Sequence, residues 1–246
     1  MEINKQKINF LSEGQKIEGT LITPKKIKGK IPGVIFFHGM TSSEKNYIPI
    51  AEKLVREGMC VMTFSIRGHG DSGGNFNNLK VPNGIKDGLN AYDFLVKHSF
   101  VDKDKIGLCG SSVGAVIVSI VSEKRKVQSI ILKAPAVYTK KMMTTTYDQT
   151  MVREDKIFKE ISDVKNTPAI KAISKFKGSL LAILSEKDNI IPNKIQEQYL
   201  KSAKKTLIKK KVIIKNADHP LTKKKWRNEF ISEMIKWFKI TLLNYE

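Results

Sequence analysis

Short apolar runs alternate with segments of helical spacing along most of this chain, and this alternation restricts its fold more than any other feature. The runs are rich in Val, Ile, Leu and Phe and are bounded by turn residues, as buried strands are. Buried strands that alternate with amphipathic helices form parallel sheets covered by helices on both faces. The sequence therefore predicts an α/β fold with about eight strands in one mostly parallel sheet. The expected strands after the N-terminal region are 33–37, 60–66, 105–109, 129–133, 179–184 and 206–214, and the expected helices are 47–57, 85–97, 113–122, 193–201 and 224–243.

Two segments depart from the alternation. Residues 7–11 and 16–23 are polar/apolar runs joined by Ser12-Glu13-Gly14, which predicts an antiparallel hairpin. Residues 138–178 lie between two strands and are far longer than an ordinary connection, so we expect a small cap there, with a helix at 153–164. We expect residues 1–246 to form a single domain that carries this cap.

Composition and charge exclude several classes of protein. The chain has 246 residues, of which 41% are hydrophobic and 28% charged, as in globular proteins that fold around a core. It has neither a long apolar span nor a signal-peptide core. Cys60 and Cys109 lie in apolar runs, as buried free thiols would. We therefore expect a cytoplasmic protein. The net charge of +20 is spread along the chain without a nucleic-acid-binding module. It predicts no nucleic-acid partner and no stable membrane insertion, and allows a weak affinity for anionic surfaces.

The motif Gly110-Ser111-Ser112-Val113-Gly114 follows an expected strand and opens an expected helix. This is the context of a G-x-S-x-G nucleophile elbow, in which small residues keep Cβ atoms out of a sharp bend. The helix N-terminus also brings backbone N–H groups beside the serine. We therefore predict that Ser112 is a nucleophile.

A serine hydroxyl needs a base and an acid that orients the base. Asp188 and His219 each follow an expected strand, and in a parallel sheet both would lie at the edge where Ser112 lies. The chain order Ser, Asp, His is also the one found in hydrolases that carry a nucleophile elbow. Glu186 and Asp218 are the rival acids, and we favour Asp188 because it lies beyond the strand end and can reach back to the imidazole.

A developing oxyanion needs N–H donors. The segment His38-Gly39-Met40 follows a strand, so we expect the backbone N–H groups of Met40 and Val113 to supply them, with Gly39 allowing close approach. Within the cap, the apolar residues that we expect to line a substrate pocket are Met142, Met143, Tyr147 and Phe158.

Taken together, these residues resemble the α/β-hydrolase superfamily over nearly the whole chain. Within it, the sequence resembles bacterial esterases of the cinnamoyl or feruloyl type and the monoacylglycerol lipase and serine aminopeptidase branch. The segment Arg67-Gly68-His69-Gly70-Asp71-Ser72-Gly73-Gly74 resembles the glycine-rich loop of that branch. The resemblance implies that Ser112, Asp188 and His219 are catalytic, that Met40 and Val113 are oxyanion donors, and that neither cofactor nor metal is needed.

The expected function is a carboxylesterase that cleaves a small-molecule acyl ester through an acyl-enzyme. A thioesterase, a lysophospholipase or a monoacylglycerol lipase would use the same residues. A peptidase is a weaker alternative, because no acidic anchor for a substrate amino group is recognisable, and a non-catalytic binding protein on this fold is the alternative from another class.

Overall fold

The computed structural model describes residues 1–152, 158 and 161–244. The helix expected at 153–164 lies largely outside these residues. Within them, no helix is both long enough and apolar enough to cross a membrane.

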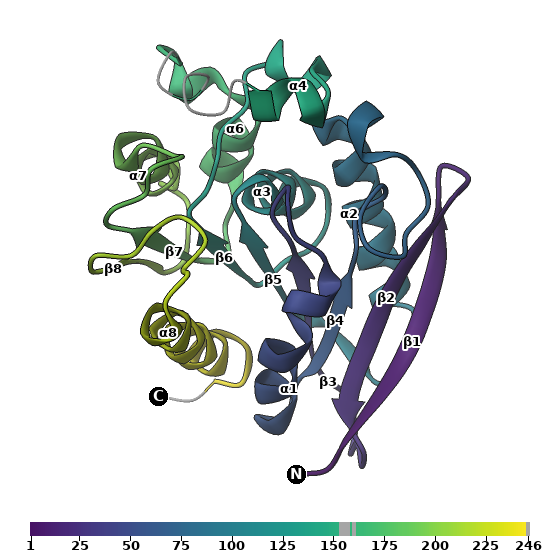
Figure 1. The fold of residues 1–246 in the computed structure, drawn as a ribbon. Helices are drawn as coiled ribbons and strands as arrows, with labels where there is room; N and C mark the ends of the chain where they lie inside the picture. The colour runs from purple at the N-terminus through teal and green to yellow at the C-terminus, as the bar shows by residue number, and fades with distance from the viewer. Residues whose placement is uncertain (153–157, 159–160, 245–246) are drawn as a thin grey trace.

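An eight-stranded sheet runs through the molecule in the order β1-β2-β4-β3-β5-β6-β7-β8 (Figure 1). The six strands from β4 to β8 are parallel to their neighbours, whereas β1 pairs with β2 and β2 with β4 in antiparallel fashion. The mostly parallel sheet expected from the sequence is therefore confirmed. The strands are β1 (Ile3–Ser12), β2 (Gln15–Pro24), β3 (Ile31–Phe37), β4 (Cys60–Phe64), β5 (Val101–Ser111), β6 (Ser129–Lys133), β7 (Ser179–Ser185) and β8 (Lys209–Ile214).

The N-terminal hairpin is longer than the sequence pattern indicated. Its strands pair from Ile3 with Pro24 to Ser12 with Gln15, which leaves Glu13 and Gly14 as a two-residue turn. Both turn residues have positive φ, at 48° and 78°, as a turn matched to the twist of a hairpin requires.

Helices cover both faces of the sheet and bury two separate apolar cores. Helices α1 and α8 cover one face, and α2, α3, α6 and α7 cover the other (Figure 1). Successive strand residues point to opposite cores, since Val34 and Phe36 join the first and Ile35 and Phe37 the second. The α-helices are α1 (Ile48–Arg56), α2 (Val81–Leu95), α3 (Val113–Lys124), α4 (Tyr147–Val152), α6 (Pro168–Lys175), α7 (Asn193–Ser202) and α8 (Lys224–Leu242), and the 3-10 helices are η1 (Glu44–Asn46), η2 (Phe76–Asn78), η3 (Met142–Thr144) and η4 (Val164–Asn166).

Helix α2 begins earlier than expected. Its first residue is Val81 and Pro82 lies in its first turn, where a missing N–H costs nothing. The side chain of Asn83 accepts the backbone N–H of Lys80 at 3.0 Å, which satisfies one of the unpaired donors at this helix end.

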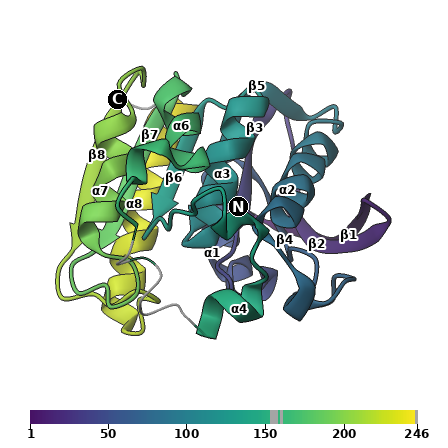
Figure 2. The ribbon, with the colours of Figure 1, turned by 90° about the horizontal axis from the view of Figure 1, so that it is seen from above.

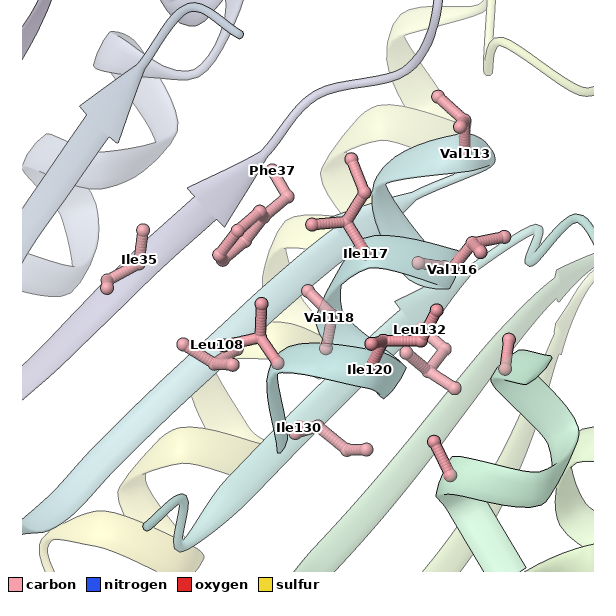
Figure 3. Close-up of a cluster of buried hydrophobic side chains, with 14 of the residues drawn as sticks. Ile35, Phe37, Leu108, Val113, Val116, Ile117, Val118, Ile120, Ile130 and Leu132 are labelled. Atoms are coloured by element: carbon pink, nitrogen blue, oxygen red, sulfur yellow. The ribbon is translucent and has the colours of Figure 1, made fainter. Parts of the chain in front are cut away.

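Helix α3 is buried along most of its length. Its residues from Val113 to Ser122 are all buried, between α2 and α6 and over the middle of the sheet (Figure 2). Figure 3 shows Val116 and Ile117 of this helix with Phe37 and Leu132 in one cluster of buried side chains. The helix that opens at Ser112 is thus held rigidly on the strands below it.

The strand order marks where a ligand would bind. Strands β3 and β5 are neighbours, but the chain leaves β3 toward β4 and leaves β5 toward β6, so the order reverses between them. In open α/β sheets, ligands bind outside the carboxyl ends of the strands at such a reversal. Gly39 and Met40 follow β3 and Ser112 follows β5, so both segments lie at this point.

Candidate active site

Ser112 stands between the end of β5 and the start of α3 in a conformation that L-residues rarely adopt. Its φ is 55° and its ψ is −117°. Such strain persists only where the surroundings enforce it, and it is typical of functional sites. A Cβ atom at Gly114 would lie 2.2 Å from the carbonyl oxygen of Phe37, and one at Gly110 would lie 2.4 Å from the carbonyl oxygen of Gly114. Both glycines of the motif are therefore required by the close packing of the bend.

His219 and Asp188 are in direct contact. Nδ1 of His219 lies 2.8 Å from Oδ2 of Asp188, with the histidine side chain 10% exposed and the aspartate side chain fully buried. Because the carboxylate accepts from Nδ1, the lone pair of the neutral ring is on Nε2, as a general base needs. The structure thus brings together two of the three residues expected to be catalytic.

Asp188 is held by donors on both carboxylate oxygens. The N–H groups of Ile190 and Ile191 donate to Oδ1 at 3.0 and 2.8 Å. The side-chain amide of Gln196, itself fully buried, donates to Oδ2 at 3.0 Å beside His219. These donors therefore hold the orientation of the Asp188 carboxylate and stabilise its negative charge.

The two rival acids are engaged elsewhere. Glu186 is exposed and accepts the backbone N–H of Asn216 at 2.7 Å. Asp218 accepts the N–H of Thr222 at 2.9 Å and thereby caps a turn. Neither carboxylate contacts the His219 ring within the described chain, so the geometry favours Asp188.

Ser112 is joined to His219 through Lys133. The N–H of Ser112 donates to the carbonyl of Lys133 at 3.0 Å, and the ammonium of Lys133 donates to the carbonyl of His219. The hydroxyl of Ser112 makes no hydrogen bond to the residues that the structure describes. Catalytic hydrogen bonds often form only when substrate is bound, so this geometry is compatible with a nucleophile.

The segment after β3 is oriented by His38. The N–H of Ile66 donates to Nε2 of His38 at 2.9 Å, so the ring proton is on Nδ1, which lies 2.8 Å from the carbonyl oxygen of Gly39. Burial and the nearby His69 lower the pKa of His38 to about 3 and keep the ring neutral. Since the C=O and N–H of one trans peptide point in opposite directions, holding the Gly39 carbonyl turns the Met40 N–H the other way.

The expected oxyanion donors are the N–H group of Met40, which follows β3, and that of Val113, the first residue of α3. A Cβ atom at Gly39 would lie 3.7 Å from Cβ of Ser112, so the two backbones pass close to each other. The N–H groups of Met40 and Val113 find no acceptor in the part of the chain that the structure describes. A buried backbone N–H is rarely left without an acceptor, so both groups are suited to receive a ligand oxygen.

The glycine-rich loop at 67–74 braces this segment. Nε2 of His69 lies 2.6 Å from the carbonyl oxygen of Met40. The loop is anchored by Arg67, whose guanidinium forms an ion pair with the fully buried Asp87 at 2.6 Å and a hydrogen bond to Ser12 at 3.0 Å. The loop therefore positions the segment after β3.

The residues expected to line a substrate pocket pack within the segment 138–178 and against its neighbours. Tyr147 is fully buried, with its ring 6.1 Å from that of His69 and 5.8 Å from that of Phe76. The ring of Phe158 lies 5.8 Å from that of Tyr138. Met142 is buried and Met143 is partly buried against the same core. Their role in binding substrate stays a prediction.

Three residues near the site were not anticipated from the sequence in the positions they hold. Gln196 bonds Asp188, Lys133 bonds His219, and His69 bonds the segment after β3. Only Lys133 carried a signal, because a charged residue that closes an otherwise apolar run is unusual at the end of a buried strand.

Two family models match the chain. The model of the prolyl oligopeptidase family matches residues 48–244, and the model of acetyl xylan esterase matches residues 6–88. No curated protein sequence matches the chain.

Solved structures resemble the chain over almost its full length. Est1E of Butyrivibrio proteoclasticus, solved with ferulic acid bound, has a TM-score of 0.75 and 19% identity over 97% of this chain and 100% of its own. The esterase Pf2001 of Pyrococcus furiosus has a TM-score of 0.76 and 22% identity over 98% of this chain and 94% of its own. A dienelactone hydrolase of Anabaena variabilis has a TM-score of 0.68 and 18% identity over 98% and 100%. These likenesses confirm the α/β-hydrolase fold.

Proposed function

The chain belongs to the prolyl oligopeptidase family of α/β-hydrolases, and we propose that it is a serine hydrolase that cleaves carboxylic esters of small molecules. The observation that carries this proposal is the contact of His219 with the buried Asp188 at the sheet edge where Ser112 stands in a strained bend. A structural turn would require neither the strain nor an oriented imidazole at the same edge.

In the proposed reaction, His219 is the base. Asp188 holds its Nδ1–H, so that Nε2 takes the proton of Ser112 as the hydroxyl oxygen attacks the ester carbonyl carbon. The imidazolium then protonates the leaving alkoxide, and an acyl-enzyme remains on Ser112. The same imidazole next deprotonates a water that attacks the acyl carbon, which releases the acid and restores the serine.

The tetrahedral intermediates of both steps carry a negative oxygen. We assign its binding to the N–H groups of Met40 and Val113, which is supported by their lack of acceptors among the described residues and by the close approach of Gly39 to Ser112. One such donor is worth roughly 3 kcal/mol of the barrier. Residues 138–178 would form the cap over the acyl or alcohol group within a single domain of 1–246.

Ester cleavage is favoured by two of the comparisons. The N-terminal part of the chain resembles acetyl xylan esterase, and Est1E holds ferulic acid, the acid product of an aromatic ester. Amide cleavage is the second candidate, because the matched family is named for a peptidase. Thioesters, lysophospholipids and monoacylglycerols would use the same residues and differ only in the pocket.

A substrate panel tests the proposal. Wild type and Ser112→Ala are compared on p-nitrophenyl esters of increasing acyl length, feruloyl and acetyl esters, an acyl thioester, a monoacylglycerol and an aminoacyl anilide. We expect wild type to hydrolyse esters and Ser112→Ala to be inactive while its thermal unfolding is unchanged. Equal turnover by the two proteins would refute the role of Ser112. A preference of wild type for the anilide would show that the activity is that of a peptidase and not of an esterase.

A further inference from the structure

Lys133 is a buried lysine beside the candidate active site, and the proposed reaction gives it no role. It is the last residue of β6 and is 6% exposed. Its ammonium donates a hydrogen bond to the backbone carbonyl of His219, while its own carbonyl accepts the N–H of Ser112 at 3.0 Å. One residue therefore bonds both the segment that carries the nucleophile and the segment that carries the base.

The charge of Lys133 is costly, since lysine is almost never fully buried unless it is paired. The groups that face it are Asp188 from the loop after β7, Asp218 and His219 from the loop after β8, and the thiol of Cys109 from β5. Burial lowers the pKa of Lys133 to about 8, and the two aspartates oppose this change. The side chain is thus a cation at neutral pH.

A buried carbonyl can be satisfied by a neutral donor, so the hydrogen bond alone does not require a charge. What a cation adds is strength, because a hydrogen bond with an ionised donor is about twice as strong as one between neutral groups. The His219 segment is therefore held more firmly than a neutral donor would hold it.

We propose that Lys133 is a positioning residue of this site, which fixes the His219 segment against the Ser112 segment so that the base stays in reach of the nucleophile. This inference rests on the proposed serine hydrolase function. It assigns Lys133 no contact with substrate.

The expected size follows from the position that the bond holds. Misplacement of a catalytic group by about 1 Å can cost roughly 10²-fold in rate. Asp188 is unchanged by substitution of Lys133, so the difference between wild type and variant isolates the lysine.

The test uses two substitutions and a matched control. Lys133→Gln retains an N–H donor but removes the charge, and Lys133→Met removes both. Lys187→Gln removes a lysine next to Asp188 that is exposed, where solvent screens the charge. For each protein, kcat and KM for p-nitrophenyl acetate are measured near neutral pH, together with the free energy of unfolding in urea.

We expect kcat of Lys133→Met to fall about tenfold with KM within about twofold, and kcat of Lys133→Gln to fall less because it retains a donor. Lys187→Gln should keep kcat within about twofold of that of wild type. A role confined to the fold would change the free energy of unfolding and leave kcat in place.

The inference is overturned if kcat of both variants stays within about twofold of that of wild type, or if neither variant folds, since Lys133 would then serve the fold alone. Failure of the proposed function is distinguishable, because it appears in the wild type. A wild-type protein that neither hydrolyses esters nor reacts with a fluorophosphonate at Ser112 would refute the reaction before any question of Lys133 arises.

Discussion

Replacing Asp188 by asparagine should cost this protein most of its activity through the wrong tautomer of His219. The carboxylate accepts four donors: two backbone N–H groups at Oδ1, and the Gln196 amide and His219 Nδ1 at Oδ2. An asparagine amide has one oxygen and one NH₂ group, so two of the donors must face the NH₂.

The hydrogen bonds in the structure determine which two donors face the NH₂ group. The backbone N–H groups of Ile190 and Ile191 cannot turn away, and leaving both unsatisfied would cost roughly 1–3 kcal/mol each. The asparagine oxygen therefore takes the place of Oδ1, and its NH₂ group faces His219. To accept from that group, the ring must move its proton to Nε2, which removes the lone pair that Ser112 needs.

We expect kcat of Asp188→Asn to fall by about 10³–10⁴, equivalent to roughly 4–5.5 kcal/mol, with KM changed by less than about threefold, by analogy with the corresponding change in serine proteases. The assay is p-nitrophenyl acetate hydrolysis at several pH values. Glu186→Gln is the matched control, since it changes a carboxylate near Asp188 to an amide, and it should retain at least about half of the activity. An active Asp188→Asn together with an inactive Glu186→Gln would refute the reasoning and exchange the roles of the two acids.

Three other changes have definite outcomes. Gly114→Ala should lower the free energy of unfolding in urea by at least about 3 kcal/mol, because its Cβ would lie 2.2 Å from a backbone oxygen. The Cβ of Gly39→Ala would lie 3.6 Å or more from its neighbours, so this variant should fold normally but lose roughly tenfold in kcat. Equal stability of the two variants would contradict this. Arg67→Met should cost about 3–5 kcal/mol, because it leaves Asp87 buried without its partner, and a loss below about 1 kcal/mol would contradict the importance of the pair. His38 has a pKa of about 3 in the folded chain and 6.5 as its ordinary value, so at pH 5 the unfolded chain binds a proton that the folded chain does not. Lowering the pH from 7 to 5 should therefore cost wild type about 2 kcal/mol of unfolding free energy through His38. His38→Gln, compared with wild type by urea unfolding at both pH values, should lack that loss.

The sheet could be predicted from the sequence because its central strands are buried on both faces. Such strands are continuous apolar runs, and the run at 129–133 coincides with β6 while the run at 179–184 falls one residue short of the end of β7. The edge strands were less predictable. Strand β1 alternates exposed and buried residues only loosely, so its start at Ile3 gives no clear signal in the sequence.

The contact between His219 and Asp188 could also be anticipated, because the carboxyl ends of parallel strands share one edge. Asp188 is preferred to Glu186 because it lies farther beyond the end of the strand, and β7 ends at Ser185. The bonds of Lys133 and His69 could not be anticipated. Lys133 and His219 are 86 residues apart, and His69 and Met40 are 29 apart, so no local pattern relates them.

Labelling with a fluorophosphonate, followed by intact-mass and peptide mass spectrometry, tests the central claim most directly. We expect one adduct per wild-type chain, located on Ser112, with no adduct on Ser112→Ala and slow labelling of His219→Gln. A wild-type chain that stays unlabelled while it hydrolyses esters, or an adduct that forms equally fast on Ser112→Ala, would contradict the assignment of Ser112 as a nucleophile activated by His219.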